Sequence, residues 1–105
     1  MRKLRGWTIT ALALVVWTLA VAAAQQRPTR LLVENNTTSV VTISARGPRG
    51  WEYRGRVNVR SSLPIYNVNN GDQFEAAWRG GRQERTVRLR HNREYGGLQD
   101  LWVVN

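Results

Sequence analysis

The chain contains no cysteine, and its only lysine is Lys3. Disulfide bonds, a thiol nucleophile and a lipid anchor on a cysteine after the N-terminal apolar run are therefore excluded. A domain of about 80 residues buries only about 60 to 65% of its unfolded surface. Without disulfides, its stability has to come from an apolar core, and oligomerisation is a possible addition.

Acidic residues are few relative to arginine. From residue 25 onward there are 13 arginines, no lysine and seven acids, so the net charge is +6 with the single histidine neutral. Guanidinium groups grip phosphates and carboxylates with two parallel hydrogen bonds. The charge therefore indicates attraction to an anionic partner. A GC-rich genome would account for the choice of arginine over lysine, but it does not remove the net charge.

Residues 1–24 have the pattern of a signal peptide. A positively charged start precedes an apolar run that ends in small residues: Arg2, Lys3 and Arg5, then Thr8 to Ala24, with alanine at 22, 23 and 24. This predicts an N-terminal signal helix, cleavage before Gln25 and export to the periplasm or the exterior. The alternative is an uncleaved anchor, because the 18 residues from Trp7 to Ala24 reach the lower limit for spanning a bilayer of ~30 Å. Membrane contact would then involve this segment alone.

Helical periodicity is absent after residue 24. Residues 25–29 read as a short polar arm, and residues 30–105 contain about seven runs in which apolar and polar residues alternate. The runs are Arg30–Glu34, Ser39–Arg46, Trp51–Arg60, Leu63–Val68, Asp72–Arg79, Arg82–Arg90 and Leu98–Val104. Short alternating runs at this spacing are typical of an all-β fold. We expect a single antiparallel β-sandwich of about seven strands with Greek-key connections.

Turn residues separate these runs. Gly47 to Gly50, Asn69 to Gly71 and the Gly80-Gly81 pair predict tight turns, because glycine and asparagine tolerate positive φ. Asn35 to Thr38 predicts another turn, which we prefer to the alternative of glycan attachment at its two Asn-X-Thr sequons. His91 to Gly97 is the longest predicted loop. Pro64 cannot donate to a sheet and predicts an edge strand or the start of one.

The run from Trp51 to Arg60 is expected to be the central strand. Period-two alternation places the large residues and Gly55 on the buried face and the charged residues on the outer face. The expected buried residues are Trp51, Tyr53, Gly55, Val57 and Val59, and the expected outer residues are Glu52, Arg54, Arg56, Asn58 and Arg60. Gly55 leaves room on the buried face, so we expect Trp78 or Trp102 to lie over it. The last run, Leu98–Val104, is apolar enough to be covered on both faces.

The order of several short elements resembles small exported bacterial β-sandwich proteins of unknown function. These elements are V-x-N-N at Val33–Asn36, an alternating strand, G-x-V at Gly55–Val57, P-I-x-x-V at Pro64–Val68, and Gly71-Asp72. The resemblance covers about half of residues 25–105. It implies a Greek-key fold of the immunoglobulin or transthyretin type and export, and it assigns no catalytic or binding residue.

Arginine offers the strongest functional signal. If the third and sixth runs are neighbours in one sheet, as they are in immunoglobulin-like sandwiches, their outer faces form one basic patch. Its residues are Arg54, Arg56, Arg60, Arg82, Arg88 and Arg90. Such a patch would hold an anionic glycan, lipopolysaccharide or the acidic surface of another protein, but no specific nucleic acid. The alternative is a solvated face with ion pairs, each of which contributes about 0 to 1 kcal/mol.

The aromatic residues have two candidate roles, core packing and contact with a ligand. Trp51 shares its predicted face with Val57, and Trp78 shares its face with Phe74, so core packing is the expected role of both. If they instead stood outside beside arginine, they would form a stacking platform for sugar rings or unpaired bases. Tyr95 lies in the predicted loop, has no core neighbours in the pattern, and is a candidate for aromatic contact with a ligand.

Catalytic and metal sites have little support. A Ser-His-acid system would have to use His91, with Asp100 or Glu94 to orient it. The oxygen-rich turn Asn67 to Asp72 suits calcium chemically, but it lacks the alternating acids and the later glutamate of a calcium loop. The sequence therefore predicts a non-enzymatic binding module without metal or cofactor. Two alternatives stay open: a structural protein that assembles through the Pro64 strand or the last strand, and a small hydrolase.

Overall fold

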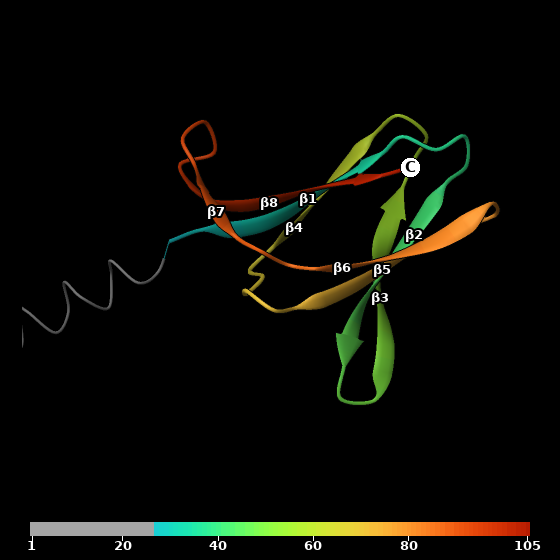
Figure 1. Ribbon diagram of the computed structural model, residues 1–105, viewed down its shortest axis with the longest axis horizontal. Helices are drawn as coiled ribbons and strands as arrows, with labels where there is room; N and C mark the ends of the chain where they lie inside the picture. Colours follow the sequence, from blue (N-terminus) through green and yellow to red (C-terminus); the bar gives the residue numbers. More distant parts are fainter. Residues whose placement is uncertain (1–26) are drawn as a thin grey trace, which may run out of the picture.

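The computed structural model describes residues 27–105, which form eight strands and no helix. The strands are β1 (Thr29–Asn35), β2 (Val41–Gly47), β3 (Gly50–Val57), β4 (Ser62–Tyr66), β5 (Gln73–Trp78), β6 (Gly81–Thr86), β7 (Arg90–Asn92) and β8 (Gly97–Val104). They build two four-stranded sheets, as Figure 1 shows. The all-β prediction is confirmed. The predicted signal helix and the first two residues of the predicted arm lie outside the described residues.

Sheet A has the strand order β4-β1-β8-β7. Strand β4 is an edge strand and contains Pro64, as predicted. Strands β1 and β8 lie in the middle and pair in parallel, from Thr29 opposite Leu98 to Asn35 opposite Val104. The expectation of a purely antiparallel fold is therefore wrong for this pair. Alternation within a run cannot reveal the direction of its neighbour, because parallel and antiparallel strands alternate alike.

Sheet B has the strand order β3-β2-β5-β6 and is antiparallel throughout. Its two hairpins carry the predicted turns. The β2–β3 hairpin turns through Pro48 and Arg49, since Gly47 and Gly50 pair directly. The β5–β6 hairpin turns through Arg79 and Gly80, one residue earlier than the predicted glycine pair. In Figure 1 the β2–β3 hairpin extends away from the strands of sheet A.

The core lies between the two sheets and is apolar. Leu31, Val33, Trp102 and Val104 contribute from the central strands of sheet A, and Val41, Ile43, Val57, Phe74 and Ala76 contribute from sheet B. Trp78 packs against the core at half burial, so its predicted core role is confirmed, and Trp102 is also buried in the core. Burial of whole aliphatic side chains at ~1.5 to 3 kcal/mol each is the main source of stability.

The run Arg82–Arg90 does not form one strand. It splits into β6 in sheet B and β7 in sheet A, with residues 87–89 crossing between the sheets. Val87 is buried at the crossing and Leu89 is half-buried. The split raises the strand number to eight. It also shortens the predicted loop, because Arg90 and His91 already pair with β8 and only residues 93–96 separate β7 from β8.

A β-bulge interrupts β3 at Arg54. Ile43 pairs with Gly55, but the next residue, Ser44, pairs with Tyr53, so Arg54 has no partner in the register. A bulge inserts one residue, so the alternation on one side of it is reversed relative to the other side, and Trp51 and Tyr53 lie on the face opposite to Gly55 and Val57. Trp51 and Tyr53 are consequently 40% and 65% exposed, and their predicted burial is wrong. Val59 is also exposed, because the strand ends at Val57 and a turn follows.

Gly55 has a close neighbour, but not a tryptophan. Its φ is +155°, and a Cβ built on it would lie 3.1 Å from Cδ2 of Leu63. Leu63 on β4, and neither Trp78 nor Trp102, therefore fills the space above the glycine. The prediction of a ring across Gly55 is wrong because the β3 and β4 edges close this side of the sandwich with an aliphatic contact.

The turn after β1 is organised by a buried asparagine. Asn35 is 2% exposed, and its Nδ2 donates to the carbonyls of Ser39 (2.8 Å) and Val57 (3.0 Å). Its Oδ1 accepts hydrogen bonds from N (2.9 Å) and Oγ1 (2.7 Å) of Thr37. The predicted turn is confirmed, and a side chain enclosed in this way is not available as a glycan acceptor.

Candidate functional site

The six predicted arginines do not form one patch. Strands β3 and β6 are the two edges of sheet B, with β2 and β5 paired between them. Arg54 and Arg56 lie on β3, and Arg60 lies in the turn beyond it. Arg82 lies on β6, Arg88 lies in the crossing segment, and Arg90 is on β7 in the other sheet. The predicted adjacency is wrong because the order of strands in a sheet is set by long-range pairing, which the run pattern does not encode.

A different surface forms on the β2–β3 hairpin, and we call it the hairpin face. Between the bulge and the hairpin turn, Tyr53 pairs with Ser44 and Trp51 pairs with Arg46. On the other side of the bulge, Arg56 pairs with Thr42. Residues in register on neighbouring strands share a face. The hairpin face therefore consists of Arg46, Trp51, Tyr53 and Arg56.

The hairpin face protrudes and is strongly cationic. The first five residues of β3 are all exposed, so neither face of this end of the strand is covered. Between residues 46 and 60 the chain carries five arginines and one acid, Glu52. Glu52 lies 3.9 Å from Nη2 of Arg54, and both side chains are 52% exposed, so this pair contributes little to stability. Nη1 of Arg46 donates to Oε1 of Gln73 at 3.1 Å, which orients its guanidinium.

The opposite edge of sheet B is closer to neutral. Nε of Arg82 lies 3.3 Å from Oε1 of Glu75, whose side chain is only 10% exposed. Glu84 pairs with Glu75 in the register and adds a second acid to the same row. Arg82 therefore faces acids on its own sheet, and positive charge is concentrated at the β3 end.

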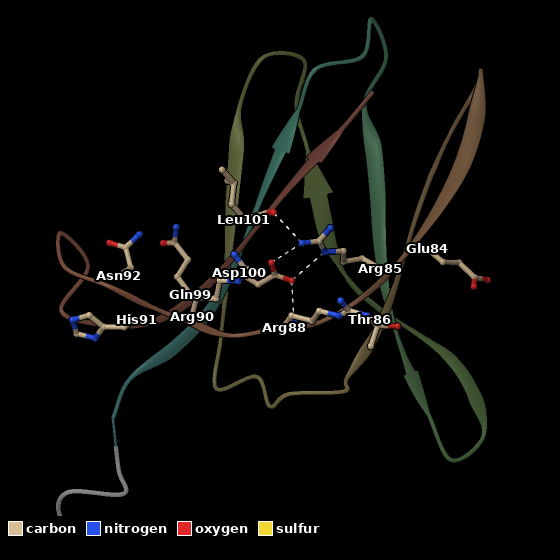
Figure 2. Close-up of a pocket in the computed structure, with 10 residues that line it drawn as sticks. All are labelled: Glu84, Arg85, Thr86, Arg88, Arg90, His91, Asn92, Gln99, Asp100 and Leu101. Atoms are coloured by element: carbon tan, nitrogen blue, oxygen red, sulfur yellow. Dashed lines mark hydrogen bonds and ion pairs between the residues drawn. The ribbon is translucent and has the colours of Figure 1, made fainter.

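A cleft of about 660 Å³ lies between the β6–β7 crossing and β8, and we call it the rim cleft (Figure 2). It brings together two of the predicted arginines, the only histidine and an ion pair. Its lining residues are Glu84, Arg85, Thr86, Arg88, Arg90, His91, Asn92, Gln99, Asp100 and Leu101.

The ion pair in the rim cleft joins the two sheets. Nη2 of Arg85 donates to Oδ1 of Asp100 at 2.7 Å, and Nε donates to Oδ2 at 3.1 Å. The Asp100 side chain is 6% exposed and the Arg85 side chain 37%. Hydrogen bonding of the guanidinium to the Asp100 carboxylate raises the pKa of Arg85, and burial opposes this effect. Arg85 is therefore a fixed cation that neutralises Asp100.

The crossing segment is held by side chains. The backbone N of Arg88 donates to Oδ2 of Asp100 at 3.2 Å, and the backbone N of Leu89 donates to Oδ1 of Asn70 at 2.6 Å. Oδ2 of Asp72 accepts from the backbone N of Asn69 at 2.8 Å. Two oxygen atoms of the oxygen-rich turn Asn67 to Asp72 are thus used by backbone amides. In residues 27–105, no group of three or more His, Asp or Glu side chains is placed to hold a metal ion.

His91 and Asp100 both line the rim cleft, but they are not hydrogen-bonded to each other. Asp100 directs its two oxygens to Arg85 and to the Arg88 backbone. In Figure 2 the imidazole of His91 lies at the far end of the cleft from this ion pair. The arrangement in which Asp100 orients His91 for a Ser-His-acid system is therefore not formed in the structure.

Tyr95 contacts an arginine of the same chain. The Arg30 guanidinium lies 4.0 Å from the centre of the Tyr95 ring, and its Nε donates to Oε1 of Gln99 at 2.6 Å. The ring is half-buried in the β7–β8 turn, where Oδ1 of Asn92 accepts from the Tyr95 backbone N at 2.9 Å. Tyr95 therefore fixes Arg30 on the outer face of sheet A.

Five residues that are central to these surfaces were not among the predicted site residues: Arg30, Arg46, Trp51, Tyr53 and Arg85. Arg85 has the same parity in its run as the buried Val87, and this parity places it on the inner side of β6. That signal was available in the sequence. No such signal exists for Arg46, because its role depends on the bulge in the neighbouring strand.

No family model, curated protein or solved structure matches this chain.

Proposed function

We propose that this protein is an exported, non-enzymatic binding module that takes an acidic glycan on the hairpin face. The observation that carries the proposal is the bulge at Arg54, which turns Trp51 and Tyr53 outward beside Arg46 and Arg56. The fold we assign to it is a Greek-key sandwich of the immunoglobulin or transthyretin type. Binding of this kind needs no metal and no cofactor.

The chemistry of the hairpin face fits a chain of acidic sugars. The apolar faces of sugar rings stack on exposed Trp and Tyr side chains, which have one apolar surface and one polar edge. Arg46 and Arg56 flank the two rings and would pair with carboxylate or phosphate groups on the sugars. Lipopolysaccharide carries the same combination of sugar rings and phosphates, so it falls in this ligand class.

Exposed aromatic side chains distinguish this surface from a purely electrostatic one. Large exposed apolar residues that cluster on one surface mark interaction sites more often than scattered ones do. Trp51 is 40% and Tyr53 65% exposed, on neighbouring positions of the same face. A surface that recognised only charge would gain nothing from these rings.

Retention on immobilised heparin at increasing salt concentration tests the proposal. Arg56→Glu should lower the affinity at least tenfold, because a charge-assisted hydrogen bond is worth about 1.5 to 3 kcal/mol. Trp51→Ala should lower affinity while leaving its salt dependence unchanged, since stacking releases no counterions. Arg54→Glu and Arg88→Glu should have smaller effects than Arg56→Glu, because neither residue lies on the hairpin face.

Arg79→Glu is the matched control, because it makes the same charge change in the β5–β6 turn. If it weakened retention as much as Arg56→Glu does, net charge alone would explain binding and the proposed site would be wrong. Unchanged retention of the Trp51→Ala variant would refute sugar stacking.

A further inference from the structure

The second half of β8 has an open edge. Strand β7 pairs with β8 only at Gly97, Leu98 and Gln99, and no other strand of residues 27–105 pairs with this side of residues 100–104. Backbone N–H and C=O groups of one residue point to the same side of a strand, and the next residue points to the other side. Leu98 and Val104 bond toward β1, so Leu101 and Val103 point their N–H and C=O groups to the open edge.

In the part of the chain that the structure describes, only long side-chain hydrogen bonds occupy the edge-facing carbonyls of Leu101 and Val103. The Leu101 carbonyl accepts a long hydrogen bond from Nη2 of Arg85 (3.4 Å), and the Val103 carbonyl accepts one from Nδ2 of Asn105 (3.5 Å). Each carbonyl has a second lone pair, so these contacts leave acceptor capacity. Edge strands in soluble proteins are usually protected by proline, charge or a covering loop. This edge instead exposes Leu101 (46%) and Val103 (39%) on the outer face.

Positive charge lies at the β7 end of the open edge. A strand that continued the line of β7 along β8 would pass the rim cleft, whose lining includes Arg88, Arg90 and Leu101. Arg88 and Arg90 are exposed and take part in no ion pair within residues 27–105, while Arg85 is already neutralised by Asp100. Arg90 pairs with Gln99 and therefore lies on the same outer face as Leu101 and Val103. A peptide at this edge would therefore meet the apolar surface of Leu101 and Val103 and, at its end next to β7, the guanidinium groups of Arg88 and Arg90, which line the same cleft (Figure 2).

We propose that β8 accepts an extended acidic peptide as an added antiparallel strand of sheet A. Its backbone would exchange hydrogen bonds with Leu101 and Val103, as in other cases of strand addition. Alternate apolar side chains would cover Leu101 and Val103, and carboxylates at the C-terminal end of the peptide, next to β7, would reach Arg88 and Arg90. The peptide site uses none of the residues of the hairpin face, so each proposal can fail without affecting the other.

A second copy of this chain is the less suitable occupant. Each copy carries a net charge of +6 over residues 25–105, so two copies repel each other. An acidic peptide is instead attracted to Arg88 and Arg90. Charge complementarity therefore selects a partner of opposite sign.

Titration of the full chain with acetyl-Val-Thr-Val-Glu-Glu-amide tests the proposal, with NMR observation of backbone amides. The amides of Leu101 and Val103 should shift and become protected from exchange. Acetyl-Val-Thr-Val-Lys-Lys-amide should bind at least tenfold more weakly. Shifts confined to Arg88 and Arg90, with no change at Leu101 and Val103, would overturn strand addition.

Proline variants separate backbone pairing from side-chain contact. Leu101→Pro and Val103→Pro each remove one edge-facing N–H, a change that an edge strand tolerates, and each should weaken the peptide at least tenfold. Leu101→Ala keeps the N–H and should bind severalfold more tightly than Leu101→Pro. Equal binding by these two variants would refute the backbone pairing. Concentration-dependent dimers in sedimentation that Val103→Pro abolishes would assign the edge to a second copy and also overturn the proposal.

Discussion

Arg85 of β6 and Asp100 of β8 form a two-pronged ion pair that bridges the two sheets, with N–O distances of 2.7 and 3.1 Å. Strand β6 faces the interior with Gln83 and Arg85 where other strands place aliphatic residues. Nε2 of Gln83 donates to the carbonyl of Asn105 at 3.2 Å and adds a second bridge. The two sheets are therefore joined by polar contacts at this rim, whereas Leu63 joins them on the β3–β4 side.

Asp100→Ala should destabilise the fold by about 1 to 3 kcal/mol, because it leaves the Arg85 guanidinium and the Arg88 amide without their acceptor. Urea denaturation followed by fluorescence measures the change. Glu84→Ala is the control, since Glu84 is an exposed acid of the same cleft. Equal losses for the two variants would show that the bridge does not hold the sheets together.

The Arg85–Asp100 interaction should not depend on pH across the neutral and moderately alkaline range. The pKa of Arg85 is raised above its ordinary, strongly alkaline value. A raised pKa of a cation gives stability that is fully present below the unfolded-state pKa and is lost only as pH rises through the folded-state pKa. The coupling energy from a double-mutant cycle of Arg85→Ala and Asp100→Ala should be equal at about pH 7 and about pH 10. A marked fall at the higher pH would contradict this account.

Deletion of Arg54 should leave binding at the hairpin face no weaker than Arg54→Ala does. Both changes remove the same charge, and without Arg54 the pairs Ile43–Gly55 and Ser44–Tyr53 follow one another directly, so Trp51 and Tyr53 stay on their present face. Retention on heparin compares the two variants, and circular dichroism checks that both are folded. Much weaker retention of the deletion variant would show that the local bend of the bulge, and not only the side on which the rings lie, is needed for binding.

Gly55→Ala should destabilise the fold by about 1 to 3 kcal/mol, because φ is +155° and the new Cβ would lie 3.1 Å from Leu63. Adding Leu63→Ala separates the two causes. If the contact dominates, the cost of Gly55→Ala should shrink in the Leu63→Ala background, and if the backbone dominates it should persist. Gly55→Ala without any loss in a urea titration would contradict both causes.

Local features of the fold were predictable from the sequence, since they depend on neighbours along the chain. The turns at Gly47–Gly50 and Asn69–Gly71 follow from the backbone freedom of glycine and asparagine, and both are found. Pro64 correctly indicated an edge strand, because proline lacks the donor that a central strand needs.

Features that depend on a neighbouring strand were not predictable. The alternation from Trp51 to Arg60 continues through Arg54 without a break, so the pattern conceals the bulge. The exposed rings on the hairpin face follow from this one extra residue. In the same way, nothing in Arg82–Arg90 shows that the chain leaves one sheet for the other at Val87, and this crossing separates Arg88 and Arg90 from the arginines of β3.

The parallel pairing of β1 with β8 also bears on the order in which the fold is built. Thr29 and its partner Leu98 are far apart in sequence, and closing so long a loop costs chain entropy before any contact compensates for it. The hairpins β2–β3, β5–β6 and β7–β8 close much shorter loops, so we expect them to form earlier. Sheet A cannot be completed until β8 is available to lie between β1 and β7. A growing chain should therefore remain open, and competent for threading through a narrow channel, until its last strand has been made.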